Sequence, residues 1–401
     1  ENPGTTVAAA DKLPENSAPN AFRSAIIPAG RLLPGILGLR GIAALAVVLF
    51  HLVHLASISA PGPFTFIAAD FGKGVHLFFV LSAFSLMHST EHTMSRPRWA
   101  DEYFVKRFFR IAPLYYCLMA GMILWPAVKS GAWSVDFQAL LLNLTFTFGF
   151  APWKGIVWAG WSVGVEMLFY AIFPVLLMTV RTRIGTMVLL AISILVAYAA
   201  RAALDIHYEH TASLYRYNWA SFSFAANLCF FAMGMYAFRV AHTIDINSAA
   251  IRWYIPAAAV ALIAVLLLTD VGRPLKLLWK ADLIVWGLAF AALSVWQSTW
   301  PSRWSANRVF EYIGERSYSI YLLHPVVIVL LKSPIQSAYA MLTPHLGAYA
   351  FFACAGLTLL PLLILSEVTY RLVELPSIRL GQRINAGKRQ PMSDVASRAT
   401  E

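Results

Sequence analysis

The sequence predicts an all-α membrane protein built as a transmembrane helical bundle. Of its 401 residues, 59% are hydrophobic and 13% are charged, a balance that is unusual for a soluble domain. The hydrophobic residues also gather in runs of roughly 20, the length of helix that crosses a ~30 Å hydrocarbon core. We therefore expect a polytopic bundle of about ten spanning helices, without a separate globular domain.

The predicted spans follow one another along the chain. The first covers residues 36–57 and the second residues 74–90. The others are expected at about residues 111–130, 160–180, 185–204, 217–240, 253–270, 281–298, 317–337 and 347–371. Residues 137–150 are apolar but too short to cross, so we expect a re-entrant or interfacial segment there.

Both ends of the chain lack a regular hydrophobic pattern. Residues 1–30 mix Ala, Pro, Asn and Ser, and we expect a flexible cytoplasmic tail rather than a cleavable signal peptide. Residues 381–401 are expected to form a second flexible cytoplasmic tail. The transmembrane domain is then expected to cover residues 31–380.

The distribution of Lys and Arg predicts the orientation in the membrane. With ten spans both termini lie on one side, and 22 of the 31 Lys and Arg residues fall on that side. Positively charged loops face the cytoplasm, so we expect cytoplasmic termini and a multi-pass protein of the cytoplasmic (inner) membrane, surrounded by its lipids. This topology explains the net charge of +11, and no nucleic-acid partner is expected.

Arg40 and His51 are ionisable residues inside the first predicted span. They are eleven residues apart, which places them within about 20° of the same helix face and ~16 Å apart along the axis. Ionisable residues within a span usually face the bundle interior and mark a site. For Arg40 the alternative is an anchor that reaches the interface, and for His51 it is a core histidine bonded to a neighbouring helix.

Glu166 lies in the predicted fourth span, about six residues or ~9 Å below the outer membrane surface, and His51 is expected at the same depth below that surface. A carboxylate bonded to one imidazole nitrogen fixes the tautomer and makes the other nitrogen a better proton acceptor. We therefore expect Glu166 to pair with His51, which would act as a general base for a hydroxyl. The alternative is that Glu166 is a structural partner of another buried polar group.

Two further groups of polar residues lie near the cytoplasmic face. Arg107 and Arg110 are three residues apart, so they share one side of a helix, and their planar guanidinium groups suit phosphates. Alternatively, they serve topology alone. Ser317, Tyr318 and His324 open the ninth span, where structural roles compete with direct chemistry. His and Cys residues show no metal-site spacing, so no metal is expected.

Five motifs resemble, in the same order, those of the membrane-bound acyltransferase family 3, which includes bacterial O-acetyltransferases of surface polysaccharides. They are Arg40 with His51 ten residues further on, GVHLFFVLSAF in the second span, RFFR at 107–110, WSVGVEMLFY around Glu166 and SYSIYLLHP in the ninth span. Ala83 departs from the pattern, because the family usually has Gly there. Its extra methyl group would narrow a donor channel at that point.

The resemblance implies transfer of an acyl group, most simply acetyl, from cytoplasmic acyl-CoA to a hydroxyl of an extracytoplasmic or lipid-linked carbohydrate. It implies that His51 is catalytic, that Arg40 supports it, and that Arg107 and Arg110 contact the phosphates of CoA. We expect Glu166 in the catalytic set, and Ser317, Tyr318 and His324 with the donor-binding residues.

Some alternatives remain at the level of the sequence. His51 deprotonates the acceptor for direct attack, or it carries the acyl group itself as a covalent intermediate. The alternative function is a transporter or flippase of a lipid-linked saccharide, and a third class is a sensor or scaffold. Some relatives carry a fused C-terminal hydrolase-like domain, whereas here we expect a stand-alone enzyme or one with a separate partner.

Overall fold

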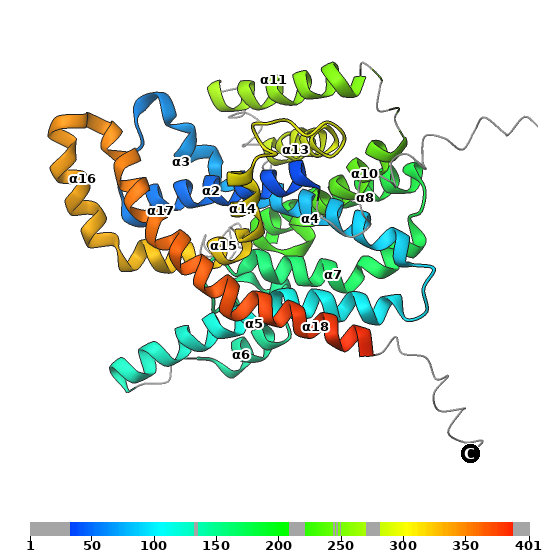
Figure 1. Ribbon diagram of the computed structural model, residues 1–401, viewed down its shortest axis with the longest axis horizontal. Coiled ribbons are helices and arrows are strands. Elements are labelled where there is room, and N and C mark those ends of the chain that lie inside the picture. Colours follow the sequence, from blue (N-terminus) through cyan, green and yellow to red (C-terminus); the bar gives the residue numbers. More distant parts are fainter. Residues whose placement is uncertain are drawn as a thin grey trace, which may run out of the picture.

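The computed structural model describes residues 33–131, 135–207, 221–243, 245, 248, 250–269 and 281–387. Every regular element in these ranges is a helix. The expected tail at residues 1–30 lies outside the described residues, as does most of the second one. Figure 1 shows that the long helices α2, α4, α5 and α7 run side by side across the molecule.

Each predicted span contains a helix. These helices are α2 (Pro34–Ala56), α4 (Gly74–Thr90), α5 (Trp99–Ser130), α7 (Trp161–Thr179), α8 (Arg183–His207), α10 (Phe224–Thr243), α11 (Ile255–Leu268), α13 (Asp282–Thr299), α15 (Ser317–Leu330) and α17 (Ala350–Thr369). The connections contain η1 (Gly62–Phe64), α3 (Phe66–Asp70), η2 (Phe71–Lys73), η3 (Glu91–Thr93), α6 (Phe137–Leu144), η4 (Thr147–Phe150), η5 (Pro152–Lys154), η6 (Ala250–Tyr254), α14 (Arg308–Glu315), α16 (Lys332–Leu346) and η7 (Gly347–Tyr349). The chain then continues through η8 (Tyr370–Glu374) into α18 (Leu375–Gly387).

Length and composition confirm a polytopic membrane protein. Seven helical stretches within the described residues are long and apolar enough to cross a membrane: Pro34–Ala56, Gly62–Thr93, Trp99–Pro126, Trp161–Thr179, Arg183–Ala202, Phe224–Thr243 and Lys332–Gly387. Arg252–Leu268 and Ser317–Leu330 are shorter apolar helices. The number of ten spans and the cytoplasmic side of the termini stay predictions.

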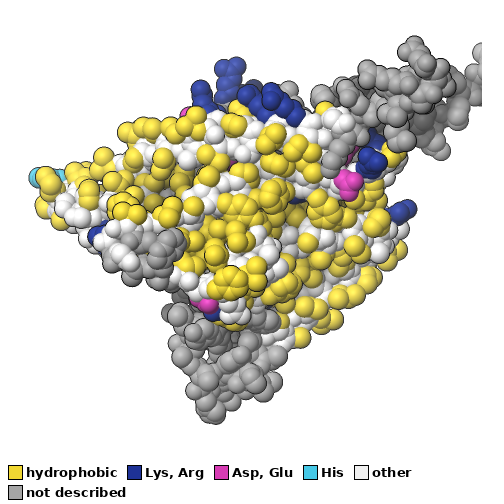
Figure 2. Space-filling model, turned by 90° about the horizontal axis from the view of Figure 1, so that it is seen from below, with side chains coloured by type: hydrophobic (Ala, Val, Ile, Leu, Met, Phe, Trp, Pro, Cys, Tyr) yellow, Lys and Arg dark blue, Asp and Glu magenta, His cyan; other side chains and the backbone are white. Residues whose placement is uncertain are grey.

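The exterior is apolar, as a lipid-facing surface must be. Large hydrophobic side chains are exposed on several helices, among them Val128 at 84% and Phe137 at 77%. Figure 2 shows hydrophobic side chains over most of the face in view, with Lys and Arg mainly at its margin. In a membrane such a surface contacts lipid in place of water, so exposed apolar side chains are compatible with a stable protein.

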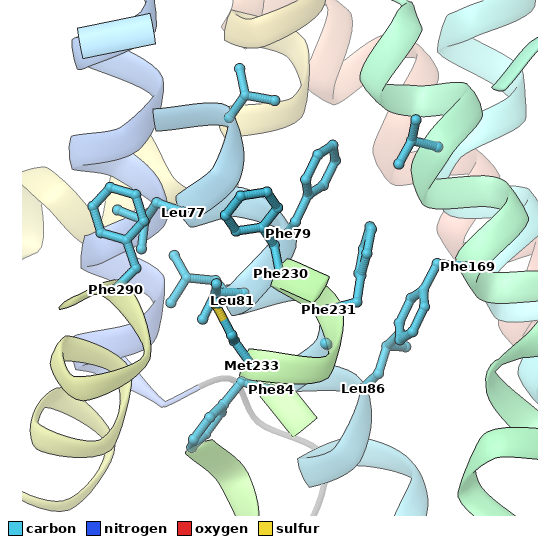
Figure 3. Close-up of a cluster of buried hydrophobic side chains, with 14 of the residues drawn as sticks. Leu77, Phe79, Leu81, Phe84, Leu86, Phe169, Phe230, Phe231, Met233 and Phe290 are labelled. Carbon is cyan, nitrogen blue, oxygen red and sulfur yellow. The ribbon is translucent and has the colours of Figure 1, made fainter. Parts of the chain in front are cut away.

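A cluster of buried aromatic and aliphatic side chains holds α4, α7, α10 and α13 together (Figure 3). The rings of Phe169 and Phe231 are stacked with centroids 4.1 Å apart, and Phe79 lies 4.7 Å from Phe231. Offset ring pairs of this kind add to the free energy gained by burial. The cluster therefore fixes α4 and α7 against each other, and both helices contribute to the cavity described below.

Glycines let α2 lie against its neighbours at backbone distance. A Cβ atom at Gly38 would lie 1.9 Å from the carbonyl oxygen of Ser305, and one at Gly314 would lie 2.0 Å from that of Leu37. Small residues permit such close approach between membrane helices. The contact between α2 and α14 therefore depends on glycine, which has no side chain, at these positions.

We expect Gly38→Ala to lower the thermal stability of the detergent-solubilised protein, by about 1–3 kcal/mol in the free energy of unfolding, because the new methyl group meets a backbone atom. Gly356→Ala is the matched control, since a Cβ there has no neighbour within 4 Å. The control should be neutral or slightly stabilising. Equal losses in both variants would contradict the close-packing argument.

The segment after α5 does not form a spanning helix. Helix α6 has eight residues, or ~12 Å of helix, which is too short to cross a bilayer. Its N-terminus is capped by Asp136, which accepts hydrogen bonds from the backbone N–H of Gln138 and from Lys154 Nζ at 2.5 Å. The Lys154 bond holds the pKa of Asp136 below its ordinary value. This agrees with the expected interfacial or re-entrant segment.

The expected ninth span, residues 317–337, is wrong as a single helix. Helix α15 ends at Leu330 and α16 begins at Lys332. Pro334 follows four residues after Leu330 and has no N–H to donate to its carbonyl, so the helix is interrupted there. Figure 1 shows α16 and α17 together at one end of the molecule.

The helical body also continues past the expected boundary at residue 380. Helix α18 runs to Gly387, so residues 381–387 are not part of a flexible tail. Gly381 is buried close to Phe109, and Asn385 donates a hydrogen bond to the carbonyl of Glu102 at 3.1 Å. Both contacts attach α18 to α5, which the hydrophobic pattern of residues 381–401 does not reveal.

Candidate active site

A small cavity lies where α2, α4, α7 and α15 meet. It encloses about 30 Å³, enough for one or two water molecules. Polar groups from three of these helices line it together with apolar side chains of α4. The lining residues are Arg40, Val75, Phe78, Phe79, Ser162, Val163, Glu166, Ser317, Tyr318 and Tyr321.

Glu166 is held at this cavity by two hydroxyl groups. Its Oε1 accepts hydrogen bonds from Tyr170, at 2.5 Å, and from Ser82. Ser82 and Tyr170 themselves lie 3.1 Å apart, hydroxyl to hydroxyl. Two further lining residues are bonded to each other, since Ser162 donates to the hydroxyl of Tyr321 at 2.8 Å. A buried carboxylate needs hydrogen-bond donors to replace water. Ser82 and Tyr170 supply them and fix the orientation of the Glu166 side chain.

Three guanidinium groups gather near Glu166. Arg40 lies 5.5 Å from the ring centre of Phe78 and is within electrostatic range of Glu166, Arg107 and Arg110. Arg107 lies 5.9 Å from the ring centre of Tyr170. Its Nε is buried without a hydrogen-bond partner among the described residues. Of the three, only Arg40 lines the cavity, together with Glu166.

Arg110 differs from Arg107 because its charge is paired. One guanidinium nitrogen lies 2.9 Å from Oε2 of Glu374, a residue that is 1% exposed. Glu374 also accepts a hydrogen bond from Ser319. Glu374 is the last residue of the π-helical turn η8. The extra residue in such a turn rotates the side chains that follow it about the helix axis. Glu367, seven residues earlier, faces Arg316 and Arg371 instead.

His51 and His324 meet one helical turn beyond the cavity residue Tyr321. His324 Nε2 lies 3.1 Å from His51 Nδ1, and the ring centroids are 4.7 Å apart. His51 Nδ1 is also 2.9 Å from the carbonyl of Val47, and His324 Nδ1 is 2.6 Å from that of Tyr321. His324 is fully buried, whereas His51 is partly exposed.

A known acyltransferase domain matches residues 33–366, which is most of the chain. The chain belongs to this acyltransferase family. The resemblance noted from its five motifs, to the membrane-bound acyltransferase family 3, is therefore confirmed.

Curated relatives cover most of this acyltransferase chain at low identity. A putative O-acetyltransferase of Staphylococcus aureus is 24% identical over 86% of the chain. A putative peptidoglycan O-acetyltransferase of Bacillus subtilis is also 24% identical over 86%, and the peptidoglycan O-acetyltransferase of Listeria monocytogenes is 22% identical over 86%. The chain spans only 55–57% of the length of these relatives. No solved structure matches it.

In this acyltransferase, His51 is not paired with Glu166 as the sequence led us to expect. The carboxylate is bonded to Ser82 and Tyr170, while His51 is bonded to Val47 and His324. Glu166 shares the cavity with Arg40, eleven residues before His51 on α2. The expected pair is therefore wrong, because Glu166 lies at the level of Arg40, about three helical turns along α2 from His51.

The other expected site residues fall into two groups. Ser317 and Tyr318 line the cavity, and Tyr318 donates to the carbonyl of Ile111 at 2.7 Å. His324 contacts His51 rather than the cavity. Arg107 and Arg110 do not line the cavity but lie within electrostatic range of Arg40, and their role in donor binding stays a prediction. Among the described residues, no cluster of His, Cys, Asp and Glu could hold a metal ion.

Ser82, Ser162 and Tyr170 are polar members of the site that the sequence analysis did not assign to it. Ser162, Glu166 and Tyr170 are spaced four residues apart on α7, so they lie on one helix face. That spacing is a signal that was present in the sequence. Ser82 comes from α4, and only the packing of α4 on α7 brings it to Glu166.

A larger hollow opens at the far end of α7, away from the cavity. It encloses about 570 Å³ and includes Glu91, Arg181 and Arg239, of which Arg239 is paired with Glu91. Leu177 of α7 lines this hollow, and Phe173, one helical turn closer to Glu166 along α7, is fully buried.

Proposed function

We propose that the chain is a membrane O-acetyltransferase that moves an acetyl group from cytoplasmic acyl-CoA to a hydroxyl of an extracytoplasmic carbohydrate. The observation that carries this proposal is the sequence of groups through the bundle. Arg40, hydroxyl groups and the carboxylate of Glu166 line the cavity, Arg107 and Arg110 lie within electrostatic range of Arg40, and the partly exposed His51 contacts His324, one turn beyond the cavity residue Tyr321. Relatives named as peptidoglycan O-acetyltransferases support both the reaction and the class of acceptor.

His51 is the proposed general base. The acceptor hydroxyl gives its proton to His51 Nε2 while its oxygen attacks the carbonyl carbon of the thioester. A new C–O bond forms, the C–S bond breaks, and the thiolate of CoA takes the proton back from the imidazolium. A positioned base of this kind contributes roughly 10²- to 10⁴-fold to the rate. Arg40 and Glu166 stay predicted members of the same site, at the cavity through which the thioester approaches.

Arg107 is the residue best suited to hold the phosphates of the donor. Its Nε has no partner among the described residues, whereas Arg110 is already committed to Glu374. A guanidinium group with free donors binds phosphate oxygens in pairs. The donor would then lie with its charged head at α5 and its thioester toward the cavity.

Arg107→Gln should raise the KM for acetyl-CoA about 10-fold or more, because a charge-assisted hydrogen bond contributes roughly 1.5–3 kcal/mol. The kcat should change less, since the residue is remote from the reacting atoms. Steady-state kinetics with varied acetyl-CoA test this. Arg96→Gln, in the exposed turn before α5, is the control. An unchanged KM in Arg107→Gln would remove this arginine from the donor site.

The direct test of the function is transfer of label. The purified protein in detergent or liposomes is incubated with labelled acetyl-CoA and soluble peptidoglycan fragments, and the fragments are then analysed for alkali-labile label. We expect O-linked acetate that is absent without protein. Consumption of acetyl-CoA with no labelled carbohydrate or lipid acceptor would contradict the proposal, as would transport of a saccharide with the acyl donor unused.

A further inference from the structure

We infer that His324 is a positioning residue, which fixes the tautomer of His51 so that Nε2 of His51 is free to accept a proton. The inference rests on the proposed function, because it gives His324 a task only if His51 is the base. It departs from the expectation that His324 helps to bind the donor. The basis is the direct contact between the two rings, on α2 and α15.

The proton on His324 can be assigned from its hydrogen bonds. His324 Nδ1 lies 2.6 Å from the carbonyl oxygen of Tyr321. A carbonyl oxygen only accepts, so Nδ1 must carry the proton. In the neutral ring the other nitrogen, Nε2, then holds a lone pair. It presents an acceptor to whatever lies next to it.

The neighbour of that acceptor is His51 Nδ1, at 3.1 Å. The same Nδ1 lies 2.9 Å from the carbonyl of Val47, so it too must donate. Its single N–H is shared between two acceptors, Val47 O and His324 Nε2. The reverse assignment requires a doubly protonated His324 where the ring is 0% exposed, and it sets the lone pair of His51 against a carbonyl oxygen. Both features are costly.

The consequence is that the neutral His51 carries its proton on Nδ1 and a lone pair on Nε2. When Nε2 takes the proton of the acceptor, the resulting imidazolium already has two acceptors at Nδ1. A second group that fixes orientation and tautomer in this way is a common requirement of histidine bases.

Comparison with other histidines separates this contact from ordinary helix geometry. His54 and His242 also donate from Nδ1 to the carbonyl four residues earlier, at 2.8 and 2.9 Å. A helix offers that acceptor to any histidine in a suitable rotamer. His51 has an additional acceptor, Nε2 of His324, which belongs to a different helix. That second acceptor holds the ring in one direction relative to α15.

Two amide substitutions test the inference, because they place the acceptor differently. The terminal amide of Gln overlays Nε2 of a histidine, so His324→Gln keeps an acceptor for His51. The amide of Asn overlays Nδ1, so His324→Asn keeps the bond to Tyr321 and loses the one to His51. We expect kcat to fall roughly 10- to 100-fold in His324→Asn and much less in His324→Gln. The KM for acetyl-CoA should be unchanged in both.

His242→Asn is the matched control, on α10 and remote from the cavity, and should leave kcat unchanged. Thermal unfolding of each purified variant checks its folding. Equal losses of kcat in the two amide variants would overturn the inference, and so would a raised KM for acetyl-CoA with kcat unchanged, which indicates a donor contact. If His51→Ala were itself fully active, the proposed role of His51 as the base would fail instead, and a negative label-transfer assay would contradict the proposed function.

A measurement on the unaltered protein serves if the variants do not fold. NMR of isotope-labelled histidine distinguishes a protonated from an unprotonated ring nitrogen, and His51→Ala identifies the resonance of His51. We expect neutral His51 to be protonated at Nδ1. Protonation at Nε2 would overturn the inference while leaving the transfer assay unaffected.

Discussion

His51→Ala should lower the rate of acetyl transfer by about 10²- to 10⁴-fold, the range that a general base contributes. The KM for acetyl-CoA should change little, because the phosphates of the donor are expected at α5 and not at His51. Steady-state kinetics with labelled acetyl-CoA measure both values. His54→Ala is the control, since His54 lies on the same helix, is exposed and makes the same hydrogen bond to the helix backbone.

Full activity in His51→Ala would contradict the proposed chemistry, and a loss of activity in His54→Ala equal to that in His51→Ala would point to damage to α2. The covalent alternative predicts the same loss in His51→Ala, so it needs a separate experiment. Double-reciprocal plots at several acceptor concentrations should intersect if the acceptor attacks the thioester directly. Parallel lines would favour an acyl-histidine intermediate over the base mechanism.

Arg110→Met should lower the free energy of unfolding by about 3–5 kcal/mol, the usual cost of leaving a buried charge without its partner. Glu374 is 1% exposed and lies 2.9 Å from the Arg110 guanidinium. Without the arginine its carboxylate keeps the hydrogen bond from Ser319 but loses the compensating charge. Denaturation of the purified protein in mixed detergent micelles measures the loss.

The matched control is Arg371→Met. Arg371 also pairs with a glutamate, Glu367, but its side chain is 70% exposed, so the loss should stay below about 1 kcal/mol. The double variant Arg110→Met with Glu374→Gln should recover much of the stability, because neither member of the pair is then a charge without its partner. Equally small losses in Arg110→Met and Arg371→Met would show that the Arg110 pair is not a buried one.

The hydrophobic pattern predicted the course of the chain well and its interruptions less well. Each expected span contains a helix, because burial in lipid requires continuous apolar helix. The error at Leu331 arose because the apolar run that ends at Leu331 was extended through Lys332 to residue 337, although Pro334 has no backbone N–H to donate. The error at 381–387 arose because Gly381 and Asn385 are buried through contacts with α5, not through their own hydrophobicity.

Sequence by itself determined which residues are unusual in a membrane. Arg40, His51 and Glu166 stand out because a charged or ionisable group inside a span is costly, and the spacing of Arg107 and Arg110 predicted that they share one side of a helix. The order of the five motifs indicated the acyltransferase family, which the domain match then confirmed.

Only the tertiary structure decided which of these residues are partners. Helical periodicity fixes the face on which a side chain lies, but neither the helix opposite that face nor the level at which it begins. Glu166 therefore meets hydroxyls from α4 and α7, while His51 meets His324 from α15. These pairings follow from how the helices pack around one cavity, a property of the whole bundle that no single span carries in its own sequence.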